Sequence, residues 1–328
     1  MLISNVLSPE MFDSEHFSDS AYHLNVEILL MGIATNGIVL VDADKKLYDQ
    51  LCDKVEALAG TGKGKKTHIL FEELLKQKRE RKIVRFVTCR PKFENGRSEE
   101  EMVATLAIKC RSDTLIVSSP EEAAKFAMMA RGSSVVPTSE YIQSDAEARR
   151  RHFSEAHLPP LDTLRPEVFD KTIVQATKFS KQLRFYDAMI GKGTGTSRFR
   201  DGIRRILKLW RDGSHFGREN LSAEIYTVVD KSHYRKKKPS ESYYIVKKEL
   251  VQRLQDELGI PINFFFKEDD SRISHCRMLQ TESICINFDQ GFDIFKPDGS
   301  FRRMVVNLYP AGEVHLSEYR NLPDFSLT

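Results

Sequence analysis

The feature that most constrains the fold is the alternation of short apolar runs with helical patterns before residue 144. Gly37–Asp42 (GIVLVD) is an apolar run that ends in an acid, as a buried strand does. Similar strand-like runs follow at Ile83–Thr88, Thr114–Ser118 and Ser134–Pro137. Helical patterns separate these runs, at Leu47–Leu58, Glu99–Cys110 and Pro120–Arg131. This alternation predicts a parallel sheet wrapped by helices.

A proline-rich segment then divides the chain. Residues 144–166 (SDAEARRRHFSEAHLPPLDTLRP) have no apolar periodicity, and prolines at this density interrupt helix and sheet alike. We therefore expect one domain over residues 1–145, a linker and connecting helix over 146–180, and a second domain over 181–328. In the second domain we expect an amphipathic helix, a longer helix and several short strands, at Phe199–Trp210, Ser242–Leu258, Ala223–Val229, Ile260–Phe266, Ile284–Phe288, Phe292–Phe295 and Met304–Leu308. This pattern predicts a second α/β domain.

Composition excludes several classes of protein. Hydrophobic residues make up 41% and charged residues 30% of the 328 residues, so the chain can bury real cores and is not disordered. The longest uncharged apolar stretch, Ile28–Ala34, is far shorter than the roughly 18 residues that span a bilayer. The N-terminus lacks the basic region of a signal peptide, and the five cysteines form no CxxC pair. We expect a cytoplasmic protein.

Charge is unevenly distributed along the chain. Residues 1–50 contain 2 basic and 8 acidic residues, whereas residues 151–250 contain 21 basic and 12 acidic ones. A basic block suggests a face for polyanions, although solvated loops and an ordinary amphipathic helix give the same count. The candidate residues for binding nucleic acid or lipid are Lys63, Lys65, Lys66, Arg235, Lys236, Lys237 and Lys238.

Acidic residues follow or begin several of the predicted elements in the first domain. Asp42 and Asp44 lie at the end of what we expect to be the first strand, where ligands bind in open α/β sheets. Glu100 and Glu121 lie at predicted helix starts. Carboxylates that converge at one sheet edge can hold Mg²⁺ or Mn²⁺ for phosphodiester hydrolysis. The alternative is that they belong to a solvated turn and to ordinary helix starts.

Residues from about 25 to 145 resemble the PIN/NYN ribonuclease superfamily. The matching segments are IVLVDAD and EEEMVATLAIKCRSDTLIVSS, a strand ending in acid and an acid-led helix followed by a strand. The resemblance implies a metal-dependent nuclease in which Asp42 or Asp44 is the first acid and Glu100 the second. The third acid falls at Pro120, which cannot bind metal, so Glu121 or Glu122 would have to replace it.

A second motif, His-x-Arg-xxxx-Glu, is formed by His275, Arg277 and Glu282. It resembles the His-x-Lys-xxxx-Asp motif of phospholipase D-type enzymes, in which histidine attacks phosphorus and the cation holds the phosphate oxygens. Arginine can also hold phosphate. Active enzymes of that group face two histidine motifs toward one another, whereas His233-Tyr-Arg235 has no matching acid. A homodimer would be needed to complete the site, so we favour a structural or binding role for His275 over catalysis.

The surrounding residues strengthen this comparison. LRFYDAMIG (Leu183–Gly191) and ISHCRMLQTESICINFDQGFDIF (Ile273–Phe295) are similar to the C-terminal domain of MIT-domain proteins. Gly291, Asp293 and Phe295 contribute most to this resemblance, which covers about residues 180–310. It implies a phospholipase D-like fold that dimerises and binds membranes without cleaving phosphodiesters.

Two hypotheses follow from the sequence. The first is a nucleic-acid-processing protein, a metal-dependent ribonuclease or nuclease component of a prokaryotic defence or conflict system. The second is a non-catalytic adapter built on degenerate enzyme folds, which binds membrane lipid, nucleic acid or a protein partner. Under both hypotheses we expect a homodimer through residues 180–328, because a two-fold axis places His275 opposite its own copy.

Overall fold

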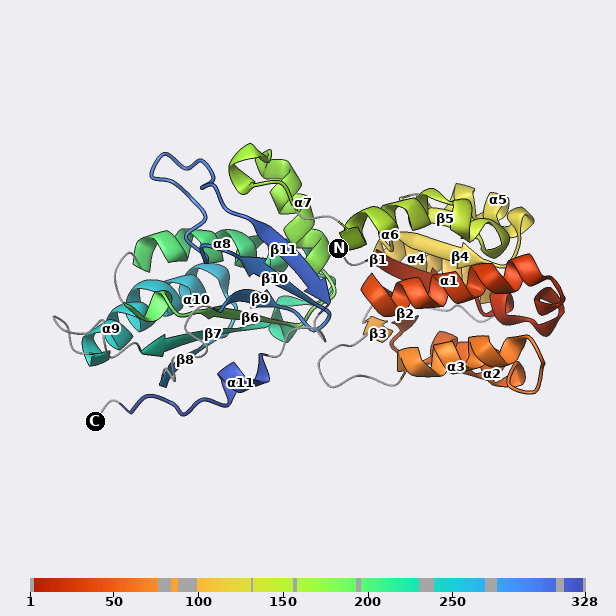
Figure 1. The fold of residues 1–328 in the computed structure, drawn as a ribbon, viewed down its shortest axis with the longest axis horizontal. Helices are drawn as coiled ribbons and strands as arrows, with labels where there is room; N and C mark the ends of the chain where they lie inside the picture. Colours follow the sequence, from red (N-terminus) through yellow and green to blue (C-terminus); the bar gives the residue numbers. More distant parts are fainter. Residues whose placement is uncertain are drawn as a thin grey trace. The chain divides into compact units, whose positions relative to one another are not determined.

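The structure is a computed structural model that describes residues 3–75, 84–87, 99–130, 132–155, 158–192, 196–229, 239–268, 276–310 and 316–326. The chain forms two compact units, Met1–Ala156 and His157–Thr328 (Figure 1). The segment 146–180 is divided between the units: helix α6 (Asp145–Glu155) lies in the first unit, and helix α7 (Pro166–Thr177) lies in the second. None of the described helices is long and apolar enough to cross a membrane.

The first unit contains a five-stranded sheet with the order β3-β2-β1-β4-β5. Every neighbouring pair of strands is parallel, which confirms the predicted parallel α/β architecture. The strands are β1 (Ile3–Leu7), β2 (Gly37–Asp42), β3 (Val84–Val87), β4 (Thr114–Val117) and β5 (Ser134–Pro137). The strand at Gly37–Asp42 is therefore the second along the chain, because β1 precedes it and occupies the centre of the sheet.

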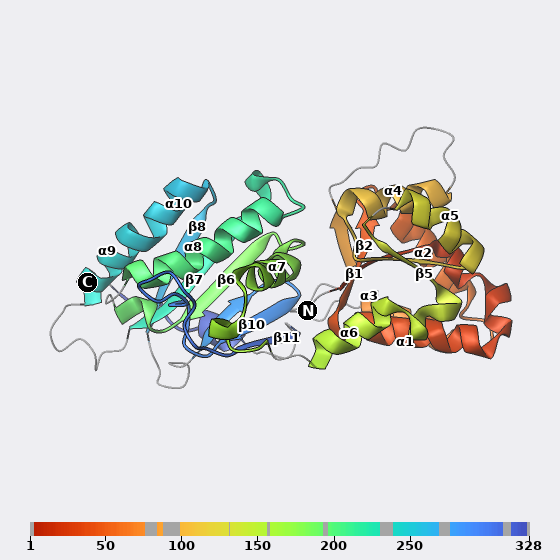
Figure 2. The same cartoon turned by 90° about the horizontal axis from the view of Figure 1, so that it is seen from above.

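Helices cover both faces of this sheet. Figure 2 shows α4 and α5 on one side and α1 and α6 on the other. The helices are α1 (Ser20–Asn36), α2 (Lys46–Ala57), α3 (Gly64–Leu75), α4 (Glu99–Cys110), α5 (Pro120–Met129) and α6. Two 3-10 turns, Pro9–Phe12 and Ser14–Ser18, connect β1 to α1. The core between these layers is made of fully buried residues such as Val6, Leu7, Leu40, Val41 and Leu115.

The second unit contains a six-stranded mixed sheet with the order β11-β10-β9-β6-β7-β8. Strands β6, β7 and β8 are parallel to one another, whereas β9, β10 and β11 are added in antiparallel fashion. The strands are β6 (Gln182–Asp187), β7 (Ser222–Val229), β8 (Ile262–Glu268), β9 (Arg277–Gln280), β10 (Ile284–Phe288) and β11 (Val306–Pro310). The second unit is thus α/β, as expected.

The longer helices of this unit lie on one face of the sheet, and the short α11 lies on the other (Figure 1). Besides α7, the helices on the first face are α8 (Thr196–Gly213), α9 (Pro239–Val246), the π-helical turn Lys247–Gln252 and α10 (Arg253–Leu258). Helix α11 comprises Ser317–Arg320. Helix α8 buries Ile203, Ile206 and Trp210 and leaves its charged residues outside. Tyr319 of α11 closes the other face by packing edge-on against Tyr186, with ring centroids 5.2 Å apart.

The prediction of a strand at Phe292–Phe295 is wrong. This segment is a turn, and only an isolated bridge between Phe295 and Phe301 has strand-type pairing. Phe292 is nevertheless fully buried, because it packs against Phe185 at a centroid distance of 5.1 Å. Apolar residues in a buried turn produce the same short run as a strand, and the sequence alone cannot separate the two.

Candidate functional site

Asp42, the first predicted metal ligand, holds the start of helix α2. Its carboxylate is buried, with the residue 1% exposed, at the carboxyl end of β2. One oxygen accepts a hydrogen bond from the Lys46 amide at 3.0 Å, and the other accepts one from the Leu47 amide at 2.8 Å. The first amides of a helix have no partner within it, so a carboxylate here satisfies them and favours the helix dipole. Asp42 therefore has a structural role that accounts for its position.

The other predicted carboxylates are dispersed around the same edge of the sheet. Asp44 is exposed in the turn after β2, and Glu100 belongs to α4, although its side chain lies outside the described residues. Glu121 is exposed in the first turn of α5, where its own amide and the Ser119 hydroxyl hold the pKa of its carboxyl below the usual range. Glu122 accepts hydrogen bonds from the amide and hydroxyl of Ser118 at 2.9 and 2.8 Å. Glu121 and Glu122 thus serve the start of α5.

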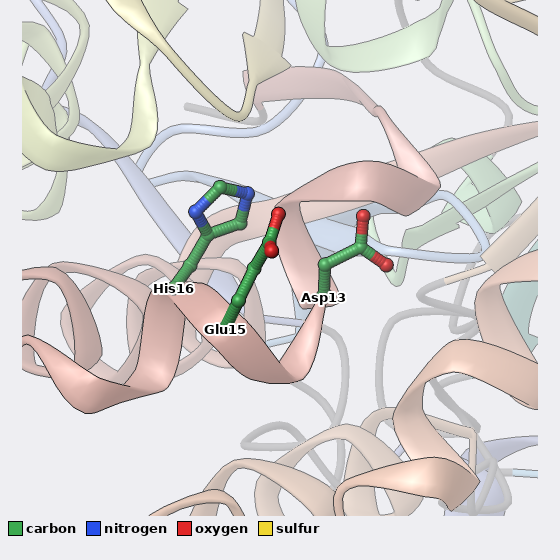
Figure 3. A group of neighbouring side chains, drawn as sticks. All are labelled: Asp13, Glu15 and His16. Carbon is green, nitrogen blue, oxygen red and sulfur yellow. The ribbon is translucent and has the colours of Figure 1, made fainter.

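The described residues do place three possible metal ligands together, at Asp13, Glu15 and His16 (Figure 3). One ligand atom from each lies within 4.8 Å of the others. The group lies in the loop between β1 and α1, and we refer to it as the loop cluster. It was missed because the short strand Ile3–Leu7, which contains polar Ser4 and Asn5, did not register as a strand. Recognition of that strand would have placed the acids of residues 10–19 at the carboxyl end of the central strand.

The loop cluster already has protein partners. The Lys54 ammonium of α2 forms an ion pair with the Asp13 carboxylate, and the His16 ring stacks on Tyr22 at 5.1 Å. Two carboxylates with an imidazole form a donor set that suits Mn²⁺ better than Mg²⁺, which prefers oxygen ligands alone. A metal bound at the same Asp13 oxygen would have to displace the ammonium of Lys54. The residues present therefore fit a divalent metal, at the cost of one ion pair.

The loop cluster and Asp42 lie at different places. Asp42 caps the beginning of α2 at Lys46, whereas Asp13 contacts Lys54, eight residues further along the same helix. At about 1.5 Å per residue, the Lys46 and Lys54 backbones are roughly 12 Å apart along the helix axis. Asp42 and Asp13 are therefore engaged by different parts of α2.

The predicted basic residues of the first unit lie beside the loop cluster. Lys63 donates to the Ser18 carbonyl at 2.9 Å and to the Ser20 hydroxyl at 3.1 Å. Lys66 forms an ion pair with the buried Glu27 carboxylate, and Lys65 is exposed. Arg235, Lys236, Lys237 and Lys238 lie outside the described residues. Of the three lysines of the first unit, Lys66 is thus paired with a carboxylate, whereas Lys63 is held by neutral oxygen atoms and keeps its charge.

In the second unit, the two described residues of the His-x-Arg-xxxx-Glu motif, Arg277 and Glu282, are separated along strand β9. His275 lies outside the described residues. Arg277 begins β9 beside Asp187, at the carboxyl end of β6, and its guanidinium donates to the Asp289 carbonyl. Glu282 follows β9 and accepts from the Lys181 amide at 3.1 Å, next to the amino end of β6. Arg277 and Glu282 thus lie at opposite ends of β9 and do not meet.

Asp187 and Gly291 pack against each other, and this contact requires both residue types. Asp187 is fully buried, and its carboxylate accepts from the Met189 amide at 2.8 Å and the Phe292 amide at 3.2 Å. Gly291 has a φ of +80°, and a Cβ on it would lie 2.2 Å from the Asp187 carboxylate.

Burial and the nearby Asp187 charge raise the pKa of the Cys276 thiol to about 12. That thiol stays protonated at neutral pH, which disqualifies it as a nucleophile.

The remaining residues of the Gly-x-Asp-x-Phe segment are also engaged in the fold. The Asp293 carboxylate lies 3.2 Å from the Arg302 guanidinium and 3.5 Å from that of Arg198. Phe295 stacks on Phe301, with centroids 5.4 Å apart. The segment that carries the resemblance to the MIT-protein domain therefore has a packing role in this unit.

Comparison with known proteins gives no family assignment. No protein-family model matches the chain, and no curated protein sequence matches it.

Proposed function

We propose that this protein processes nucleic acid, and that its first unit is a PIN-like domain that hydrolyses phosphodiester bonds with a divalent metal. The observation that carries the proposal is the loop cluster, which gathers Asp13, Glu15 and His16 after the central strand of a parallel sheet. The sequence assigned the metal-binding role to four acids, Asp42, Asp44, Glu100 and Glu121. On this proposal the loop cluster takes that role instead.

The position of the loop cluster supports the proposal. From β1 the chain continues to β2 on one side, while β4 pairs with the other side of β1, so the order of strands reverses there. Ligands of open α/β sheets bind outside the carboxyl ends of the strands at such a reversal. A divalent metal at this point supplies an activated water and charge neutralisation for phosphodiester hydrolysis. Lys63 and exposed Lys65 lie on the neighbouring helix hairpin and add positive charge for a polyanion.

The test is cleavage of single-stranded RNA, single-stranded DNA and duplex DNA with Mn²⁺ or Mg²⁺, compared with EDTA. We expect Mn²⁺ to support cleavage, and Glu15→Gln or His16→Gln to reduce it at least tenfold without a change in melting temperature. Glu140→Gln is the matched control, since Glu140 is an exposed acid after β5 at the same sheet edge. Metal-independent cleavage, or none on any substrate, refutes the nuclease proposal.

A specific observation favours a second candidate, the non-catalytic adapter. The carboxylates of Asp42 and Glu122 are both bound to backbone amides at helix starts, which is the role expected where an enzyme fold has lost its site. In that case the protein binds nucleic acid, and Mn²⁺ leaves the substrate intact. Binding without cleavage therefore selects the adapter over the nuclease.

We further propose a homodimer through residues 180–328, on the basis of the resemblance to the dimerising MIT-protein domain. Sedimentation velocity at micromolar concentration tests it, and the expected result is a single species of twice the chain mass. A monomer at that concentration removes the dimer and any composite histidine site.

A further inference from the structure

A basic cavity lies in the second unit. It has a volume of about 540 Å³ and lies between helix α8 and the segment 295–299. Its lining consists of Arg198, Asp201, Arg204, Arg205, Lys208, Glu257, Phe295, Lys296, Pro297 and Gly299. We refer to it as the α8 pocket. Five of these residues are cationic and two are acidic, so the lining has an excess of positive charge.

From these features we infer that the α8 pocket binds single-stranded nucleic acid, with Arg198, Arg204, Lys208 and Lys296 on the backbone phosphates and Phe295 against a base. The inference rests on the proposed function for the class of ligand. It does not depend on whether the first unit cleaves that ligand.

Several of the cations are exposed and are held by the fold only through long ion pairs or through none among the described residues. Lys208 and Lys296 are exposed, and neither has a carboxylate within ion-pair distance among the described residues. Arg204 is 48% exposed and lies 3.7 Å from both Asp201 and Glu257, longer than a hydrogen bond. By contrast, Arg205 is engaged, because its Nε donates to Asp170 at 2.9 Å in a two-point contact.

The fold holds the pocket wall in a fixed position. Arg198, Arg204 and Lys208 project from one face of α8, while the opposite face is buried in the core. At Gly202 the helix backbone approaches the adjacent turn so closely that a Cβ would lie 2.0 Å from the Phe292 carbonyl oxygen. Cations on a rigid helix lose little conformational freedom of the backbone when they bind, which favours recognition of a polyanion.

Phe295 supplies an aromatic surface beside these cations. It is half-buried, and its ring is fixed by stacking on Phe301, which in turn packs on Phe169 at 5.2 Å. A positively charged groove with an aromatic side chain is the usual device for single strands, because every base has a face that can stack. A cavity of this size accommodates a ligand group of the size of a nucleotide.

The lining favours nucleic acid over a membrane surface. Peripheral membrane binding requires large apolar side chains that project into the bilayer interface. The exposed large apolar residues of the described part of this unit are Val168, Tyr244 and Val305, and none of them lines the pocket. A concave, arginine-lined site instead suits a single projecting phosphodiester group.

The experiment measures binding of a short fluorescein-labelled single-stranded RNA of mixed sequence to the full chain across a salt series. For the double variant Lys208→Ser with Lys296→Ser we expect affinity at low salt to fall at least tenfold. The slope of log K against log salt should fall by about 1.4, since each lost phosphate contact contributes about 0.7 for a single strand. The matched control is Lys171→Ser with Lys248→Ser, which removes two exposed lysines of the same unit that lie outside the pocket.

A second pair of variants tests the aromatic contact. Phe295→Ala should weaken binding by about fivefold to a hundredfold, as for the loss of one stacked base, and Phe295→Tyr should restore it. The melting temperature of each variant shows whether the unit has remained folded. A fall in affinity without recovery in Phe295→Tyr overturns the role assigned to the ring.

The outcomes separate this inference from the proposed function. RNA binding that depends on the pocket lysines, without any cleavage, supports the inference and refutes the nuclease proposal. Cleavage with a pocket variant that binds like the control supports the nuclease and overturns the inference. Vesicles with anionic lipid that bind through the pocket while RNA does not also overturn it, because the pocket is then a lipid site.

Discussion

The two units use their charged residues in opposite ways. In the first unit, Asp42 is buried at a helix start and the Glu147 side chain is 1% exposed, held by two arginines. In the second unit, Arg198 and Arg204 on α8 are 57% and 48% exposed, and the nearest carboxylates are 3.5 to 3.7 Å away. Of the two groups, the exposed arginines can meet a ligand at a smaller cost to the fold than the buried carboxylates.

The difference follows from the cost of burying charge. A buried carboxylate must be compensated by hydrogen bonds or an ion pair, so its partners are part of the folded state. An exposed arginine contributes little to stability and keeps its hydrogen-bonding capacity for a ligand. In the sequence, a buried carboxylate and an exposed arginine both appear simply as charged residues. Burial and existing partners decide which charges can serve binding.

Replacement of Gly291 by alanine tests whether the second unit also contains structurally committed polar residues. At a φ of +80° and with Cβ 2.2 Å from the Asp187 carboxylate, alanine displaces that buried carboxylate as well as straining the backbone. We expect a loss of about 3 kcal/mol or more in the free energy of unfolding, measured by urea denaturation.

Gly299→Ala is the matched control for this variant. Gly299 has a similar φ of +84° but nothing within 4 Å of the added Cβ, so only the backbone strain of about 1–2 kcal/mol remains. Equal losses in the two variants would show that the contact with Asp187 contributes nothing, and that the segment Gly291–Phe295 is free to have another role.

Glu147 provides a test based on pH in the first unit. Burial opposes ionisation of its carboxyl, but hydrogen bonds from Arg150 and Arg151 outweigh it and hold its pKa below the ordinary value of 4.5. A lowered folded-state pKa stabilises the fold above the unfolded value, and this stabilisation is lost as the pH falls through the folded value. Glu147→Gln should therefore cost about 2 kcal/mol at neutral pH, and the deficit should shrink below about pH 4. A deficit that is independent of pH would show that the charge of Glu147 is not what stabilises α6.

The sequence predicts most of the parallel architecture of the first unit. Gly37–Asp42 and Ser134–Pro137 match β2 and β5, and Glu99–Cys110 matches α4, because each is a clear periodic or apolar run. Two elements were not predicted, the central strand β1 and helix α1. Helix α1 buries residues such as Asn25 and Glu27 alongside Leu29, so its apolar residues are not confined to one stripe.

The candidate sites were harder to predict, for a physical reason. Sequence shows that Asp42 follows a strand, but it does not show that the carboxylate turns back to the amides of Lys46 and Leu47. Likewise, the spacing of Arg277 and Glu282 suggests one motif, whereas a strand between them places them at opposite ends of the sheet. Side-chain partners depend on tertiary geometry, and residue spacing carries little information about it.

Asp42 can be replaced in two ways that separate a cap from a metal ligand. Asp42→Ala should cost about 1–2 kcal/mol of stability, because the amides of Lys46 and Leu47 lose their acceptor. Asp42→Asn keeps one acceptor oxygen and should cost about half as much or less. Thermal denaturation gives both values. If Asp42→Asn leaves stability unchanged but abolishes Mn²⁺-dependent cleavage, the carboxylate is there for metal, and the contrast between the two units fails.

The smallest expected effect concerns Lys54, which pairs with Asp13 in the loop cluster. The two side chains are 41% and 29% exposed, so the ion pair should contribute at most about 1 kcal/mol, and Lys54→Gln should change stability by no more than that. The same change removes the cation that competes with a metal for the Asp13 carboxylate, so Mn²⁺ affinity, measured by calorimetry, should rise several-fold. Lys65→Gln is the control, because Lys65 is an exposed lysine on the neighbouring helix. Weaker or unchanged Mn²⁺ binding in Lys54→Gln would mean that Asp13 is not a metal ligand. The acids of the loop cluster would then be structural, like Asp42.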